Sequence, residues 1–352
     1  MIIEKPCISA GLFFLLLTSP MYQFAIIGCG RIAARHAENC NRVGRLKAVC
    51  DVAPQKADAL AKLYDAKVYD NIDDLLKEEQ EVNIVCVCTP NGLHAEHCIK
   101  SLQAGKHVLC EKPMCITSIA AWQMIDTAFF FRRKLFVVKQ NRYNPGIQLL
   151  RKLLDELALG TVYSFAINCF WNRPQAYYDG GWKGTNDLDG GILYTQFSHF
   201  IDVLYWLLGD ITHVVARKEN YAKRNCFELE DTLIALLQMQ NNCIGTLNCT
   251  INSYHQNTEG SLTIFGEKGT VKIGGQYLNT IDWFHIEDKN PPEAVAYSPS
   301  NQYGFYEGSM SNHHLVYDDL INALNNNQST IVEATEAAKT IEIIEKIYRA
   351  AQ

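Results

Sequence analysis

The chain has 352 residues, of which 48% are hydrophobic and 20% are charged, and its formal net charge at pH 7 is −6. This length suits about two domains with filled cores, and the composition is that of a globular protein rather than a disordered one. The net negative charge argues against a nucleic-acid partner.

The first twenty residues contain an apolar run, residues 8–17, shortly before the first predicted strand. About ten apolar residues are too few to span a bilayer, and no small-residue cleavage site follows them. We interpret residues 1–20 as an extension upstream of a natural start at Met21. The alternative is a signal or membrane-associating segment. The remaining chain predicts no membrane partner.

The thirteen cysteines are scattered along the chain and several lie in apolar runs, such as Val85–Cys88. This pattern predicts reduced, buried thiols in a cytoplasmic protein. Cys86 and Cys88 are too close together for a zinc half-site and have no second half, so we predict no metal site.

Residues 22–33 read YQFAIIGCGRIA, which predicts a strand, a tight glycine turn and a helix from residue 31 to residue 41. The G-x-G-x-x-A pattern is typical of a dinucleotide-binding fold, where the helix N-terminus faces the pyrophosphate. An ordinary strand–helix turn is the alternative. The predicted cofactor residues here are Gly28, Gly30, Arg31 and Ile32.

The second predicted strand, residues 46–50, ends at Asp51, about twenty residues after the glycines. An acid at this point accepts hydrogen bonds from the adenosine ribose and repels a 2′-phosphate. Asp51 therefore favours NAD over NADP. The alternative is an aspartate that only shapes the turn.

Strand and helix patterns then alternate up to a strand at residues 135–139, with helices at 54–64, 94–104 and 118–131. Such alternation predicts a Rossmann domain, residues 21–141, with a doubly wound parallel sheet and ligands at the carboxyl ends of its strands. Those ends fall at Gly28–Gly30, Asp51, Thr89–Asn91, Glu111–Pro113 and Gln140–Arg142.

The pattern changes after Pro145, and residues 142–352 predict a second, α+β domain. A helix at 146–157, a strand at 162–171, a polar loop at 172–191 and one long helix at 192–208 come first. Strands between residues 213 and 286 predict a large, mostly antiparallel, open sheet. A long loop at 287–308 and two helices, 314–325 and 332–351, complete the chain.

Several motifs resemble those of the Gfo/Idh/MocA oxidoreductases. They are the glycine turn, Cys88–Asn91 followed by His94, Glu111-Lys112-Pro113, Arg142–Pro145, and Gly190-Gly191 leading to His199-x-x-Asp202. The resemblance covers Met21 to the end, and several stretches resemble the branch that oxidises UDP-N-acetyl-hexosaminuronates at C3 for bacterial surface polysaccharides. It implies an NAD-dependent dehydrogenase whose cofactor also contacts Thr89, Pro90, Asn91, His94, Glu111, Lys112 and Gln140.

The resemblance places a catalytic trio at Lys112, Thr195 and His199, although the family has an aspartate where this chain has Thr195. Four residues apart, Thr195 and His199 would share one face of a continuous helix. His199 would take the hydroxyl proton and Lys112 would stabilise the reacting oxygen. We also expect a cis Lys112-Pro113 bond. A core histidine and a surface lysine are the alternatives.

The expected substrate residues are Arg142, Tyr143, Trp182, Lys183, Thr195 and His199, with residues 177–189 as the wall of the site. His313 and His314 either line its far end or start a helix. The predicted substrate is a sugar or nucleotide sugar. The alternatives are a free-sugar, inositol or dihydrodiol dehydrogenase and a non-catalytic NAD-binding regulator. An open sheet face would favour a homodimer or homotetramer.

Overall fold

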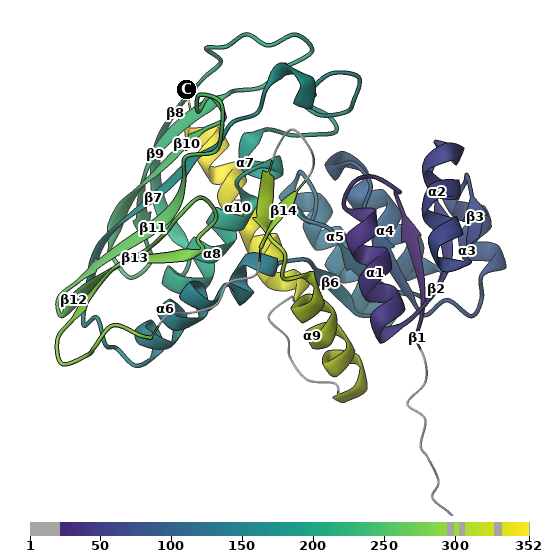
Figure 1. The fold of residues 1–352 in the computed structure, drawn as a ribbon, viewed down its shortest axis with the longest axis horizontal. Helices are drawn as coiled ribbons and strands as arrows, with labels where there is room; N and C mark the ends of the chain where they lie inside the picture. Colours follow the sequence, from purple (N-terminus) through teal and green to yellow (C-terminus); the bar gives the residue numbers. More distant parts are fainter. Residues whose placement is uncertain (1–21, 294–298, 303–306, 327–332, 352) are drawn as a thin grey trace, which may run out of the picture.

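The computed structural model describes residues 22–293, 299–302, 307–326 and 333–351. It contains two large sheets, one in each half of the chain, with the two C-terminal helices between them (Figure 1). The predicted extension at residues 1–20 lies outside the described residues. No helix among the described residues is both long and apolar enough to cross a membrane.

The first sheet is a six-stranded parallel sheet, which confirms the predicted parallel arrangement, and its strand order is β3-β2-β1-β4-β5-β6. Its strands are β1 (Tyr22–Ile27), β2 (Gly44–Cys50), β3 (Lys67–Tyr69), β4 (Ile84–Val87), β5 (His107–Cys110) and β6 (Leu135–Val137). Its helices are α1 (Ala33–Val43), α2 (Pro54–Tyr64), α3 (Ile72–Glu78), α4 (His94–Gln103) and α5 (Ser118–Phe130).

All four residues of β4 are buried, because helices cover both faces of the sheet. The strand order reverses between β1 and β4, and ligands bind parallel sheets at such a point. The prediction of buried, unpaired thiols is confirmed for the described cysteines, with one exception. All twelve are free, and only Cys226 among them is exposed.

The second sheet has seven strands in the order β13-β12-β11-β7-β10-β9-β8, and only β7 and β10 are parallel neighbours. Its strands are β7 (Val162–Phe170), β8 (Ile211–Glu219), β9 (Thr232–Met239), β10 (Ile244–Thr250), β11 (Glu259–Gly266), β12 (Gly269–Gly274) and β13 (Thr280–Ile286). The domain also contains α6 (Pro145–Asp155), α7 (Ile192–Thr195), α8 (Ser198–Leu208), β14 (Ser300–Gln302), β15 (Glu307–Met310), α9 (His313–Asn326) and α10 (Ala334–Ala350).

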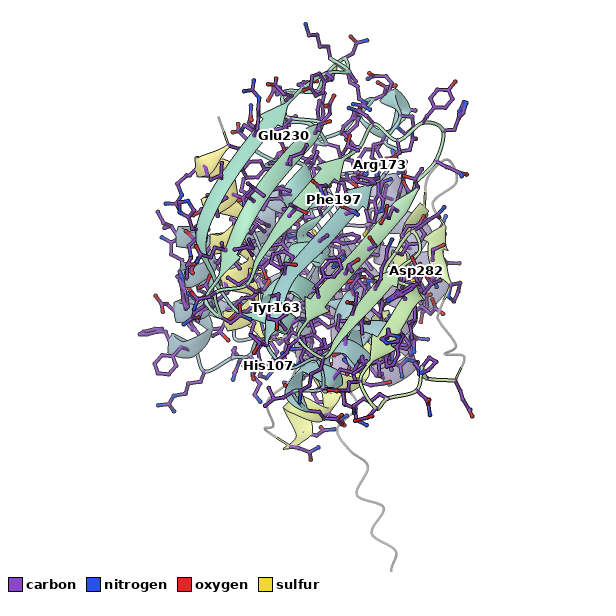
Figure 2. The ribbon with its side chains drawn as sticks, turned by 90° about the vertical axis from the view of Figure 1, so that its left-hand side faces the viewer. His107, Tyr163, Arg173, Phe197, Glu230 and Asp282 are labelled. Atoms are coloured by element: carbon purple, nitrogen blue, oxygen red, sulfur yellow. The ribbon has the colours of Figure 1, made fainter. Side chains whose placement is uncertain are left out.

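Helices cover only one face of this sheet (Figures 1 and 2). Along β9, Leu233, Ala235 and Leu237 are buried whereas Ile234 and Leu236 are more than half exposed. The strand therefore alternates between a helix-covered core and an open face, as predicted for an open antiparallel sheet.

The long loop expected at residues 287–308 is partly wrong, because β14 and β15 pair as a small antiparallel hairpin within and beyond it. The chain then returns to the first domain, where α9 packs against α1 and Tyr317 joins the core around Phe24. The last helix, α10, contacts both α5 and α8. The C-terminal helices thus fix the two sheets relative to each other.

Candidate active site

The glycine turn after β1 is shaped by contact with the neighbouring strand. Gly28 has a φ of +92°, and a Cβ there would lie 2.7 Å from the backbone carbonyl carbon of Cys88. At Gly30 a Cβ would meet no atom within 4 Å, so this part of the backbone faces open space. This is the cradle that a pyrophosphate requires at the start of a helix.

A cavity of about 700 Å³ opens in front of this turn. That volume is typical of small-molecule and cofactor sites. Most of the predicted site residues line it, namely Gly30, Arg31, Ile32, Thr89, Asn91, His94, Glu111, Lys112, Gln140, Trp182, Lys183, Thr195 and His199. Segments distant in the sequence therefore meet at one place, as the strand-end argument predicted.

Gly28, Asp51 and Pro90 lie beside the cavity lining rather than in it. The Asp51 carboxylate accepts hydrogen bonds from the backbone N–H groups of Cys29, at 2.7 Å, and Ala53, at 2.8 Å. The side chain is thus fixed at the end of β2, next to the glycine turn.

The structure does not bring Arg142 and Tyr143 to the cavity. Arg142 is fully buried, and its guanidinium donates to both carboxylate oxygens of Asp202, at 2.7 and 2.9 Å, and to Glu336. The Tyr143 hydroxyl donates to Asp319 at 2.9 Å. These contacts tie the segment after β6 to the C-terminal helices.

Asp202 also pairs with Lys139, whose Nζ lies 2.7 Å from Oδ1. Burial acts to raise the pKa of Asp202, but the charges of Arg142 and Lys139 outweigh burial and hold that pKa below its usual range. Asp202 is thus a carboxylate that ties α8 to the segment after β6.

Lys112 projects from the end of β5, and the Lys112-Pro113 peptide bond is cis, as predicted. Its Nζ donates to the backbone carbonyl of Thr195 at 2.8 Å. Burial lowers the pKa of Lys112 to about 8, and the nearby charges of Lys183 and Arg173 act in the same direction. The ammonium can therefore lose its proton close to neutral pH.

The single helix predicted for residues 192–208 is wrong, because the chain forms two helices with a break at Gln196 and Phe197. The backbone N–H groups of both residues donate to the Ile192 carbonyl, which closes α7. In a continuous helix the Thr195 carbonyl would bond to the His199 amide, whereas here it accepts the Lys112 ammonium. Thr195 and His199 line the same cavity from different helices.

Thr195 is hydrogen-bonded to a buried carboxylate that the sequence reasoning did not single out. Its hydroxyl donates to Asp189 Oδ1 at 2.5 Å and accepts from Asn91 Nδ2 at 2.7 Å. Burial raises the pKa of Asp189. The only sequence signal was its position before Gly190-Gly191. A carboxylate therefore lies one hydrogen bond behind the position where the family has an aspartate.

His199 is buried, and its Nε2 lies 3.0 Å from Gln140 Nε2. Burial lowers the pKa of His199 to about 3, and the positive charge of Lys112 acts in the same direction. The imidazole is thus neutral at physiological pH. With the Gln140 amide donating, Nε2 is the acceptor, and such a nitrogen can take up a proton.

The cavity is rich in positive charge. The cations Arg31, Lys56, Lys112, Arg173 and Lys183 line it, against the acids Glu111 and Asp179. Arg173, which the sequence reasoning missed, follows β7 and is almost fully buried. Its Nε donates to Gln196 at 2.8 Å, and its guanidinium carbon lies 4.8 Å from the centre of the Trp171 ring.

Glu111, which lines the cavity, is held from behind by two buried histidines. Its Oε1 lies 2.8 Å from His36 Nε2 and 3.3 Å from His313 Nε2, and His36 Nδ1 lies 2.8 Å from the Tyr317 hydroxyl. Among the described residues, only this His–Glu–His group has the composition of a metal site. The distances from Glu111 to the two histidine nitrogens suit direct hydrogen bonds. His313 thus begins α9 and supports Glu111, while His314 is exposed.

The sequence matches two family models over most of its length. One, described as an oxidoreductase family with an NAD-binding Rossmann fold, matches residues 22–137. The other, described as the C-terminal alpha/beta domain of the same oxidoreductase family, matches residues 151–352.

Three known proteins illustrate the likeness. The solved WlbA dehydrogenase from Bordetella pertussis, in complex with NADH and UDP-GlcNAcA, is 33% identical, with a TM-score of 0.84 over 94% of this chain and 96% of that one. Glucose-6-phosphate 3-dehydrogenase from Bacillus subtilis is 26% identical over 93% of this chain and 96% of its own length. Inositol 2-dehydrogenase from Paracoccus denitrificans is 26% identical over 71% of this chain and 73% of its own length.

Proposed function

The chain belongs to the Gfo/Idh/MocA family and is an NAD-dependent sugar oxidoreductase, and from this premise we propose that its substrate is a nucleotide-linked N-acetyl-hexosaminuronate oxidised at C3. The observation that carries the proposal is the cationic lining of the cavity beside Lys112 and His199. A uronate carboxylate and a diphosphate are both anions, whereas inositol carries no charge.

Arg173 and Lys183 are the residues that we assign to the anionic groups of the substrate. Arg173 is held by Gln196 and by the carbonyl of Asn172, so little entropy is lost when it binds a ligand. Lys183 Nζ lies 3.6 Å from the centre of the Tyr177 ring. Both cations line the same cavity as Lys112, and their charges lower its pKa.

The residues around the glycine turn suit NAD. The open space at Gly30 and the N-terminus of α1 fit a pyrophosphate, and Asp51 would accept hydrogen bonds from the ribose and repel a 2′-phosphate. Bound NAD would supply the hydride acceptor for the carbinol carbon of the substrate. We assign the remaining predicted cofactor contacts to the cavity residues Arg31, Ile32, Thr89, Asn91, His94, Glu111, Lys112 and Gln140.

The proton chemistry is assigned to His199 and Lys112. The neutral His199 accepts the hydroxyl proton as the substrate C–O bond gains double-bond character. The Lys112 ammonium turns from the Thr195 carbonyl to the reacting oxygen and stabilises its negative charge. Asp189, through Thr195 and Asn91, keeps this side of the cavity in place.

A dehydrogenase for a free or phosphorylated sugar is the second candidate, because curated relatives include glucose-6-phosphate 3-dehydrogenase and inositol 2-dehydrogenase. A screen of UDP-sugar uronates, glucose 6-phosphate and inositol with NAD, followed by nicotinamide absorbance, separates the candidates. Turnover of inositol alone would reject the nucleotide-sugar proposal.

Arg173→Met should raise KM for an anionic substrate about 10- to 100-fold, since a charged hydrogen bond is lost.

We also propose that the open face of the seven-stranded sheet joins copies of the chain into a homodimer or homotetramer. Val215, Leu236, Ile244 and Trp283 are each more than half exposed on these strands. A face of this kind is typical of an interface between subunits. Light scattering of Leu236→Asp, with Leu63→Asp on α2 as the control, tests it; an unchanged mass in both variants would reject it.

A further inference from the structure

The C-terminal end of α5 is apolar on its outer face as well as on its inner face. Ala121, Met124 and Ala128 are buried in the core, on a helix that packs against α4 and α10. On the outer face, Phe129 is 86% exposed and Phe130 is 78% exposed. A helix that is apolar all round is normally buried on every side. This end of α5 therefore has the composition of a helix whose outer face is covered by another surface.

Two charges of opposite sign flank the exposed rings. Asp126 precedes Phe129 and Phe130 by three and four residues, so it lies on the same face of the helix. Arg132 follows them in the left-handed conformation, with a φ of +51°, at the point where the helix ends. Both side chains are exposed, and among the described residues neither charged group has a hydrogen-bond or ion-pair partner. We call Asp126, Phe129, Phe130 and Arg132 the α5-end patch.

This order of charges makes the patch complementary to itself. A two-fold axis through the phenylalanine pair exchanges the two sides of the patch, so the acidic side of one copy meets the basic side of the other. Asp126 of each copy then faces Arg132 of the second copy, and the four phenylalanine rings meet between the two ion pairs. Opposite charges across an interface fix its register, whereas like charges in contact disfavour it. Neither a neutral apolar partner nor an anionic surface would satisfy both charges.

We propose that the α5-end patch joins two copies of this chain across a two-fold axis. The contact is distinct from the open face of the seven-stranded sheet, because the patch belongs to the first domain and the open face to the second. The two contacts together join four copies, whereas the α5-end contact alone joins two. The proposal does not depend on the identity of the substrate.

The patch is small, so the contact is weak by itself. A fully covered phenylalanine buries about 150–250 Å², and the two rings of each copy are roughly four-fifths exposed. The rings of two copies would together bury on the order of 500–800 Å², whereas a stable interface buries at least about 1,200 Å². The contact becomes effective when copies are already paired elsewhere, because two such pairs then meet through two α5-end contacts at once.

Association through this patch leaves the active site open. α5 ends shortly before β6, at the edge where the parallel strands begin, whereas the cavity lies where they end. Arg133, the residue after the patch, donates to the carbonyl of Gly105 just before β5 begins, which places it at the same edge. Variants of the patch should therefore retain the NADH binding and the kcat/KM of the parent, and these two measurements report an intact fold.

The first test is the particle mass, measured by light scattering at several protein concentrations. Phe129→Ser/Phe130→Ser should halve the mass where the parent is fully associated and raise the Kd of the contact at least about tenfold. Leu63→Ser is the matched control, because Leu63 is 73% exposed on α2, outside the patch. Equal masses for the phenylalanine variant and the parent would overturn the proposal. Binding to anionic vesicles that this variant loses without a change of mass would assign the rings to a lipid surface instead.

Leu236→Asp separates this contact from the sheet face. Combined with Phe129→Ser/Phe130→Ser, it should give monomers, whereas each change by itself should leave the other contact in place. A halved mass in the phenylalanine variant together with an unchanged mass in Leu236→Asp would support the α5-end contact and reject only the sheet face.

Charge exchange tests the two-fold arrangement itself. Asp126→Arg places cations against each other in both halves of the contact, and Arg132→Glu places acids there, so each variant alone should have the halved mass. Mixed in equal amounts, the two proteins restore both pairs of opposite charges, and the parental mass should return. Full association of either variant by itself would overturn the proposal, and so would a mixture that fails to regain the parental mass.

Discussion

Replacing Lys183 by methionine should move the alkaline limb of the pH–rate profile to higher pH. The proposed role of Lys112 requires its protonated form, so activity is present below the pKa of Lys112, about 8, and is lost as pH rises through it. The neighbouring charges of Lys183 and Arg173 lower this pKa, after burial itself. Removing the Lys183 charge therefore stabilises the Lys112 ammonium.

The size of the shift follows from one unit charge in a partly hydrated site. At an effective dielectric between about 20 and 80, a charge several ångströms away is worth on the order of 1 kcal/mol, or about 0.5–1 pKa unit. The limb should therefore move from about pH 8 to roughly 8.5–9. The low pKa of His199, about 3, predicts no acidic limb between about pH 5 and 7 from this group.

The assay is kcat/KM for sugar oxidation measured across pH, since this ratio reports the free enzyme. Lys56→Met is the matched control: Lys56 also lines the cavity but is not among the largest influences on the pKa of Lys112. The reasoning is refuted if the limb stays in place in Lys183→Met, or if both variants shift it equally.

Three further predictions test the site and the fold. His199→Ala should lower kcat about 10²- to 10⁴-fold, as expected for loss of a general base. NADH fluorescence titration should show unchanged cofactor binding in this variant. Full activity would exclude His199 as the base. Arg142→Met should lower the free energy of unfolding by about 3–5 kcal/mol, because Asp202 keeps a buried charge with fewer partners, and denaturant unfolding measures this. A raised KM with unchanged stability would instead make Arg142 a substrate ligand. Asp51→Asn should reduce the preference for NAD over NADP at least about tenfold in kcat/KM, and an unchanged ratio would remove Asp51 from cofactor selection.

The first domain and its cofactor turn could be read from the sequence because their signals are local. Glycines at 28 and 30, the apolar strands and the alternation with helices each depend on a few neighbouring residues. Parallel strands then place all their carboxyl ends at one edge. This is why Lys112, Gln140 and the glycine turn could be assigned to one cleft before the structure was known.

The tertiary structure decided what cannot be inferred from neighbours in the sequence. The apolar pattern of residues 192–208 is typical of one continuous helix, yet the chain breaks at Gln196 and Phe197. The break leaves the Thr195 carbonyl available, and the distant Lys112 donates a hydrogen bond to it. Arg142 lies in the segment that follows β6, where a ligand-binding residue is expected, yet Asp202, 60 residues later, and Glu336 on α10 keep it out of the cavity.

The sequence by itself thus predicted the fold of the nucleotide-binding half, NAD as the cofactor and Lys112 and His199 as the candidate catalytic pair, because each rests on short-range spacing or on a family motif. Only the folded chain showed the buried Asp189 behind Thr195, the cationic Arg173 beside the cavity and the two histidines under Glu111. Charge, burial and hydrogen bonding depend on distances in space. For the histidine pair under Glu111, the protein sets those distances by returning α9 to the first domain.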